Sequence, residues 1–206
     1  MSNGNSTATL PVMEQFYTIQ GEGAFSGHAA YFIRLGGCDV GCVWCDVKES
    51  WDAAIHPQVP IDELVNEAAK NPSKTVVITG GEPLMHNLTS LVLHLQKKGC
   101  RVHIETSGAH ALHGEAFDWI TVSPKKFKPP VDDVLLKADE LKIVVFNKSD
   151  FDWAQLHATK VSAKCRLYLQ PEWDKRNEMM PLIVEYVKVH PQWNISLQTH
   201  KYLQIP

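Results

Sequence analysis

Short runs of apolar residues recur along the chain, and most of them are followed by a segment in which apolar residues repeat at helical spacing. The repeats predict helices over residues 60–71, 88–98, from about 149 onwards, and 177–190. The runs predict strands over residues 12–19, 29–35, 74–79, 101–105, 119–122, 140–145, 166–169 and 194–197. Strands that alternate with helices in this way are typical of an α/β fold with a mostly parallel sheet.

Polar and glycine-containing segments follow one predicted strand after another. Gly80-Gly81-Glu82-Pro83 follows the 74–79 strand, and Glu105-Thr106-Ser107-Gly108 ends the 101–105 strand. Because the carboxyl ends of parallel strands meet at one rim, ligands bind there in both open and closed sheets. Six or more strands joined by right-handed crossovers predict an incomplete barrel of the (β/α)6 type, in which some crossovers are loops.

The composition is that of one ordinary globular domain. The chain has 206 residues, of which 44% are hydrophobic and 21% are charged. We expect a single domain over residues 12–206, preceded by a disordered tail over residues 1–11, which are rich in Ser, Asn, Thr and Gly. The formal net charge of −3 disfavours a nucleic-acid partner. No apolar run or signal-peptide pattern indicates a membrane segment, so we expect a cytoplasmic protein that does not bind membranes.

Three of the five cysteines lie in one loop directly after the 29–35 strand. Cys38, Cys42 and Cys45 have the spacing C-x3-C-x2-C, and no fourth cysteine lies nearby. A [4Fe–4S] cluster usually has four cysteine ligands, so three would leave one iron open for chemistry. The alternative is a zinc site that takes an aspartate or histidine as its fourth ligand. Cys100 and Cys165 are expected to be small core residues.

The cysteine spacing resembles that of the radical S-adenosylmethionine (SAM) enzymes. This resemblance implies a radical SAM partial barrel in which the amino and carboxylate groups of SAM chelate the open iron. It also implies that the reduced cluster cleaves SAM to a 5′-deoxyadenosyl radical.

A wider set of motifs resembles one family within that superfamily, 7-carboxy-7-deazaguanine synthase. The resemblance covers nearly the whole chain from residue 16, and the turn Gln20-Gly21-Glu22-Gly23 with the tail Gln198-Thr199-His200-Lys201 is its most specific part. It is carried as well by the Arg34 strand with its cysteine loop and by the motifs that begin at Gly80, Glu105, Ser123 and Gln170. It implies that 6-carboxy-5,6,7,8-tetrahydropterin loses a hydrogen from C6 and contracts to 7-carboxy-7-deazaguanine with loss of ammonia, and that SAM is regenerated. It further implies a homodimer and a flavodoxin-like electron donor.

The resemblance also assigns roles to individual residues. The cluster ligands would be Cys38, Cys42 and Cys45. The SAM site would be formed by Trp44, Asp46, Gly80, Gly81, Glu82, Gly108, Ser123, Pro124, Lys125, Gln170, Pro171 and Glu172. The pterin would be held by Ile19, Gln20, Gly21, Arg34, Thr106 and Pro206, with Arg34 on its carboxylate and Pro206 contributing an α-carboxylate.

Several of these residues have a plain structural alternative. Glu82 and Glu105 would then be solvated carboxylates at strand ends, and Arg34 would pair with a structural carboxylate. Lys125 would belong to a solvated basic loop, and His200 would be a satisfied structural histidine.

The chain departs from the family at one position. Many relatives have Thr or Ser two residues after the last cysteine, where the hydroxyl binds Mg²⁺. This chain has Val47, which offers no side-chain oxygen. A magnesium ion would therefore be absent, bound more weakly, or held by Asp46, Glu49 or Ser50.

Two other function classes share parts of the pattern. A radical SAM activase that makes a glycyl radical on a partner protein has the same cysteine spacing, but it needs neither the 20–23 turn nor the 198–201 tail. A non-enzymatic zinc or redox-sensing domain would bind one zinc and be colourless.

Overall fold

The structure, a computed structural model, describes residues 8–206 and contains one nine-stranded sheet. The strand order is β3-β1-β2-β4-β5-β6-β7-β8-β9. Strands β2 and β4 to β9 run parallel, whereas β1 is antiparallel to both β2 and β3. The strands are β1 Thr9–Ile19, β2 Ala29–Leu35, β3 Gln58–Pro60, β4 Thr75–Gly80, β5 Arg101–Thr106, β6 Trp119–Val122, β7 Glu140–Val145, β8 Arg166–Pro171 and β9 Trp193–Ile195.

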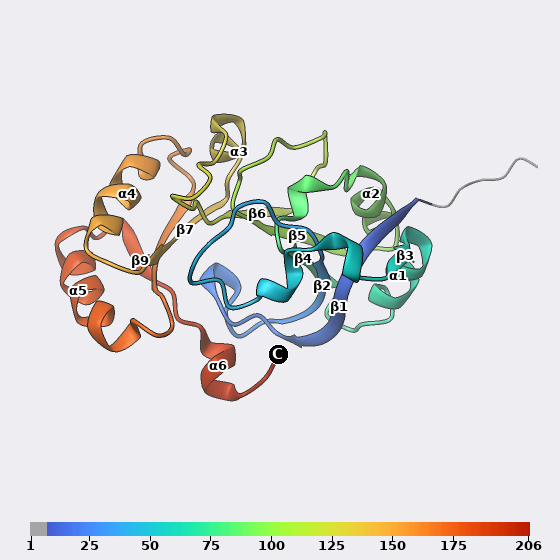
Figure 1. The fold of residues 1–206 in the computed structure, drawn as a ribbon, viewed down its shortest axis with the longest axis horizontal. Coiled ribbons are helices and arrows are strands. Elements are labelled where there is room, and N and C mark those ends of the chain that lie inside the picture. The colour runs from blue at the N-terminus through green and yellow to red at the C-terminus, as the bar shows by residue number, and fades with distance from the viewer. Residues whose placement is uncertain (1–7) are drawn as a thin grey trace, which may run out of the picture.

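Helices cover the outside of the curved sheet (Figure 1). They are α1 Ile61–Ala68, α2 Thr89–Lys97, α3 Asp132–Leu136, α4 Ser149–Ala158 and α5 Arg176–Val189, whereas the short α6, Thr199–Leu203, lies apart from this outer layer near the end of the chain. Helix α1 begins after Pro60 and carries Asp62 and Glu63 in its first turn, where acidic side chains favour a helix start. The β5–β6 connection, all of which is described, contains no helix. This arrangement confirms the predicted incomplete (β/α)6-type partial barrel with a mostly parallel sheet.

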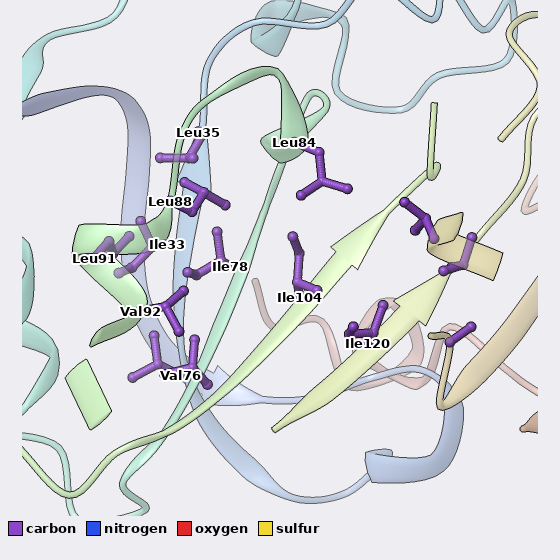
Figure 2. Close-up of a cluster of buried hydrophobic side chains, with 14 of the residues drawn as sticks. Ile33, Leu35, Val76, Ile78, Leu84, Leu88, Leu91, Val92, Ile104 and Ile120 are labelled. Carbon is purple, nitrogen blue, oxygen red and sulfur yellow. The ribbon is translucent and has the colours of Figure 1, made fainter. Parts of the chain in front are cut away.

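Alternation along the strands separates an apolar outer face from a polar inner face. In β7, Leu141, Ile143 and Val145 are fully buried in the main core, whereas Lys142 between them lines the inside of the sheet. Figure 2 shows part of the outer layer, where Ile33 and Ile78 of the sheet lie near Leu91 of α2. The two-residue period of a strand thus places core side chains outside and chemistry-bearing side chains inside.

Three segment predictions need correction. Most of the predicted tail lies outside the described residues, but its last residues, Thr9 to Pro11, belong to β1 and pair with Gln58 to Pro60. The second of these segments is β3, a strand that is not among those predicted from the sequence. The last strand is β9, Trp193–Ile195, not 194–197, because the chain turns away towards α6 after Ser196. No helix within residues 8–206 is long and apolar enough to cross a membrane.

Candidate active site

A cavity of about 280 Å³ lies at the carboxyl ends of the parallel strands. We call it the active-site cavity. It brings together residues that are far apart in the chain. Of the predicted site residues, its wall contains Ile19, Gln20, Gly21, Arg34, Cys38, Cys42, Trp44, Cys45, Asp46, Gly80, Gly81, Thr106, Ser123, Lys125, Gln170, Glu172 and Pro206. Glu82, Gly108, Pro124 and Pro171 are outside this wall.

The cysteine loop is fixed at its base by backbone hydrogen bonds. Gly37 N donates to Ser50 O at 2.6 Å, and Cys38 N donates to Trp51 O at 3.1 Å. The three loop cysteines pack in a small cluster with Val40 and Ala109, apart from the main core. Burial raises the pKa of the Cys42 thiol to about 11 in the protein alone, and bound iron acts in the opposite direction by favouring the thiolate.

The donor set suits a cluster with one open iron. All three loop thiols line the active-site cavity, while Cys100 and Cys165 are buried in the main core. Within residues 8–206, no group of three or more His, Cys, Asp or Glu side chains is placed to hold a single metal ion. A four-iron cluster differs in that it spreads its thiolate ligands over several metal atoms.

The two glycines of the 80–83 motif make room for the backbone at the base of the cysteine loop. A Cβ on Gly80 would lie 2.2 Å from Leu35 O, and the φ of this glycine is +143°. A Cβ on Gly81 would lie 2.3 Å from Gly37 O. The sequence suggested that these glycines admit a ligand; the structure shows that they also admit the loop that carries the cysteines.

Glu82 is not a solvated carboxylate. Its side chain is buried and hydrogen-bonds the segment after β4 to the end of β5. The residue is only 1% exposed. It accepts hydrogen bonds from Leu84 N at 3.0 Å, Thr106 Oγ1 at 2.5 Å and Ser107 N at 2.8 Å. The structure does not bring Glu82 to the cavity wall, so a direct contact with SAM remains a prediction.

Lys142 is a central residue of the cavity that the sequence analysis missed. It is 3% exposed, and its Nζ donates to Glu22 Oε2 and, at 2.9 Å, to Glu105 Oε2. Gln20 Nε2 donates to Glu105 Oε1 at 2.8 Å, and Gln198 Nε2 donates to Glu22 Oε1 at 3.0 Å. We call Lys142, Glu22 and Glu105 the acid–lysine network. The signal in the sequence was a single lysine inside an apolar run.

The charges in this network stabilise one another. Burial opposes the charged form of Lys142, but the carboxylates of Glu105 and Glu22 raise its pKa above the ordinary value. Burial would raise the pKa of Glu22, yet the ammonium of Lys142 lowers it to about 2. One cation therefore faces two carboxylates, and the network offers acceptor oxygens to a ligand that carries N–H groups.

The 20–23 turn and the 198–201 tail form one wall. Gly21 O accepts from both Thr199 N and Thr199 Oγ1, each at 2.9 Å. A Cβ on Gly21 would lie 2.2 Å from His200 Nδ1, so the ring of His200 occupies the space that the glycine leaves free. Burial lowers the pKa of His200. This fit gives a physical reason for the two motifs to occur together.

Two basic residues of the wall have structural partners as well. Arg34 Nε donates to Glu14 Oε1 at 2.6 Å across the β1–β2 pair. Lys125 Nζ donates to Ser123 O at 2.7 Å and to Ser123 Oγ at 2.6 Å, and it lies 5.7 Å from the centre of the Trp44 ring. Lys125 is half-buried and lines the active-site cavity, so it does not belong to a solvated loop, and burial lowers its pKa.

Comparisons with known proteins agree with this geometry. The model of the radical SAM superfamily matches residues 32–143. The 7-carboxy-7-deazaguanine synthase of Flavobacterium psychrophilum is 56% identical, over 96% of this chain and 93% of the relative. That of Synechocystis is 50% identical, over 97% of this chain and 95% of the relative. The crystal structure of QueE from Escherichia coli superimposes with a TM-score of 0.80 at 33% identity, over 92% of this chain and 93% of that chain. The chain therefore belongs to the 7-carboxy-7-deazaguanine synthase family of the radical SAM superfamily.

Proposed function

We propose that the protein converts 6-carboxy-5,6,7,8-tetrahydropterin to 7-carboxy-7-deazaguanine with loss of ammonia. The observation that carries the proposal is the content of the active-site cavity. It holds three cysteine thiols, an arginine and the acid–lysine network within one wall. A radical SAM reaction needs the three thiols to hold its cluster. A carboxylated pterin needs the arginine for its carboxylate and the acid–lysine network for its N–H groups.

Membership of the radical SAM superfamily implies a [4Fe–4S] cluster and SAM. When bound, they supply the abstraction of a hydrogen atom from the substrate. The cluster would be held by Cys38, Cys42 and Cys45. The backbone at Gly80 and Gly81 and the hydroxyl of Ser123 lie in the same wall and would bind and orient SAM.

The other side of the wall suits the two ends of the pterin. The pyrimidine end of a pterin carries amino and ring N–H donors, and Glu22 and Glu105 present carboxylate oxygens to such groups. The carboxylate end would pair with the guanidinium of Arg34. Lys142 remains protonated beside both acids, so its role is to hold their charge and position and not to transfer a proton. The tail over residues 198–201 lines this side of the cavity and is held there by the hydrogen bond from Thr199 N to Gly21 O.

The direct test is turnover under anaerobic conditions. The protein is reconstituted with iron and sulfide and incubated with SAM, dithionite and the pterin, and the products are followed by mass spectrometry. The proposal expects loss of ammonia from the pterin without stoichiometric consumption of SAM. Cleavage of SAM with an intact pterin would instead favour the glycyl-radical activase. A colourless protein with one zinc would favour the binding domain.

We expect a weaker dependence on Mg²⁺ than in relatives with Thr or Ser at the position of Val47. Val47 lines the active-site cavity without a side-chain oxygen. Of the substitute ligands, Asp46 Oδ2 is paired with Lys201 Nζ at 2.9 Å, and Ser50 Oγ donates to Val47 O at 2.7 Å. Turnover is titrated with Mg²⁺ in the native protein and in Val47→Thr, which should respond more strongly. A strict requirement for Mg²⁺ in the native protein, equal to that of the variant, would contradict the expectation.

Lys201 connects the tail to the cysteine loop. Its Nζ pairs with Asp46 Oδ2 at 2.9 Å and lies 5.1 Å from the centre of the Trp173 ring. These partly exposed contacts together are worth about 1 kcal/mol. We therefore expect Lys201→Met to raise the KM for the pterin roughly five-fold, with a smaller change in kcat.

Steady-state kinetics check the Lys201 prediction, and hydrogen exchange of the tail supplies a second measurement that needs no cofactor. Amides such as Thr199 N should exchange faster in Lys201→Met. Lys188→Met is the matched control, because Lys188 forms an exposed pair with Glu185 at 3.0 Å on α5. Equal KM and equal exchange in the Lys201 variant and the native protein would show that this contact does not hold the tail.

We also propose a homodimer and a flavodoxin-like electron donor, which the family resemblance implies, and a cytoplasmic location. Exposed apolar side chains on α4 and α5 support an association surface: Leu156 is 52% exposed and Val189 is 71% exposed. Sedimentation of the native protein beside Val189→Asp tests the dimer, since the variant should weaken association through this surface.

A further inference from the structure

A second cavity, of about 240 Å³, lies at the amino ends of the strands, away from the cysteine loop. We call it the amino-end cavity. Its wall is formed by Gln20, Phe25, His28, Ala29, Ala30, Ser73, Thr75, Val77, Arg101 and His103. Gln20 is the residue that this wall has in common with the active-site cavity.

The ionisable side chains in the wall of the amino-end cavity are all basic. Its ionisable wall residues are Arg101, His28 and His103, and the wall contains no carboxylate. Hydroxyl groups of Ser73 and Thr75 add further polar positions. Two carboxylates outside the wall act on His103: Asp118, which accepts from Val102 N at 2.8 Å and from Gln96 Nε2 at 3.2 Å, and Glu105, which accepts from Gln20 Nε2 at 2.8 Å.

His103 is the residue whose environment is incomplete. It is 4% exposed, and among the described residues its Nε2 atom has no hydrogen-bond partner. Buried polar nitrogens nearly always have a hydrogen-bond partner, so we expect a water molecule or a ligand to bond to this atom. Burial, and next the charge of Arg101, lower the pKa of His103 to about 4, so the ring is neutral near pH 7 and can donate through one nitrogen.

We propose that the amino-end cavity binds a small oxyanion of the phosphate or carboxylate class. The guanidinium of Arg101 provides a planar pair of donors that matches such a group. Nε2–H of His103 and the hydroxyl of Ser73 complete the donor set. Phe25, whose ring lies 4.5 Å from that of His103 and 5.8 Å from the Arg101 guanidinium carbon, closes an apolar side that an organic anion can use.

The shared wall connects this site to the active-site cavity. Gln20 Nε2 donates to Glu105 Oε1 at 2.8 Å, and Gln20 Oε1 accepts from Glu22 N at 3.1 Å. Gln20 therefore separates an anion in the amino-end cavity from Glu22 and Glu105, the two carboxylates that we assign to the pterin. Binding of the anion itself does not depend on the proposed reaction, and it is tested without cluster, SAM or pterin.

The test is calorimetric titration of the full-length protein with inorganic phosphate, at ionic strength matched with chloride. We expect saturable binding at one site per chain, competition by sulfate, and an affinity at least about ten-fold lower in Arg101→Met. Arg166→Met is the matched control and should bind as the native protein does. Arg166 begins β8 of the same sheet, as Arg101 begins β5, and lies over an aromatic ring, Trp119, at 5.5 Å, but it is outside the cavity wall.

A second variant and two contrary results complete the test of anion binding. If Arg101→Met does not fold, Arg101→Lys keeps the charge without the planar donors and should bind phosphate with intermediate affinity. The absence of saturable binding up to about 50 mM phosphate would overturn the proposal and leave water as the partner of His103. Equal weakening in the Arg101 and Arg166 variants would overturn it too, because the anion would then bind through general surface charge.

Discussion

Replacing Cys38 by alanine is expected to give a folded, colourless protein without turnover. Two remaining thiolates, Cys42 and Cys45, cannot retain a four-iron cluster that already has only three protein ligands. The fold should persist because Cys38 packs in the small cluster with Val40 and Ala109 and not in the main core. Iron content and visible absorption after anaerobic reconstitution measure the loss. A shift of the melting temperature of no more than a few degrees would show that the fold is intact.

Cys100→Ala is the matched control for that variant. Cys100 is 5% exposed in the main core, so its loss should lower the free energy of unfolding by about 1 kcal/mol while iron content and turnover stay at the native level. Opposite profiles in the two variants would separate a ligand from a core residue. A Cys38 variant that kept its colour and four irons would contradict the assignment of the cysteine loop.

Replacing Lys142 by methionine is expected to affect both stability and activity. It would leave Glu22 and Glu105 as neighbouring carboxylates without their cation. Removal of one member of a buried ion pair commonly costs 3–5 kcal/mol; we expect about 3 kcal/mol because both acids are partly exposed. Urea unfolding measures this loss. The KM for the pterin should rise as well, because the two carboxylates would lose the cation that holds them in position. Without that cation, burial raises the pKa of Glu22, and a protonated acid is a poorer acceptor.

The pH dependence of stability gives an independent check on Lys142. The folded-state pKa of Glu22 is lowered from 4.5 to about 2, so its contribution is complete above pH 4.5 and is lost as the pH falls towards 2. In Lys142→Met this acid-side loss should be much smaller. Lys137→Met, which removes an exposed pair with Asp133 at 3.0 Å, should leave both the urea midpoint and the acid limb nearly unchanged. A Lys142 variant that behaved like this control would show that the acid–lysine network contributes little.

The pattern of apolar residues predicted most of the sheet because its parallel strands contain several consecutive buried residues and stand out as short apolar runs. The same reasoning missed β3, since Gln58 to Pro60 form a short edge strand with no period of their own. Their partner is Thr9 to Pro11, which the composition had placed in a disordered tail. Pairing between distant short segments is a tertiary effect that local propensity does not contain.

Motifs predicted the members of the site better than their contacts. Glu82 and Glu105 have the same strand-end context, yet Glu82 connects β4 to β5 and Glu105 pairs with Lys142. The difference arises because Glu82 lies in the turn that follows β4, whereas Glu105 lies within β5 and its side chain lines the cavity. Lys142 itself belongs to no motif, and only the inward direction of its position in β7 places it among the acids. Distances across the barrel are therefore what the sequence could not supply.

The seam between Gly21 and Thr199 has a consequence for how the protein folds. The hydrogen bond there joins residues 178 positions apart, and the strands between them must be in order before the two segments can meet. We expect this seam to close late in folding and to open with less free energy than the central strands, as a separate cooperative unit. This wall of the cavity would then open locally while the sheet stays folded, and substrate and product could enter and leave through the opening.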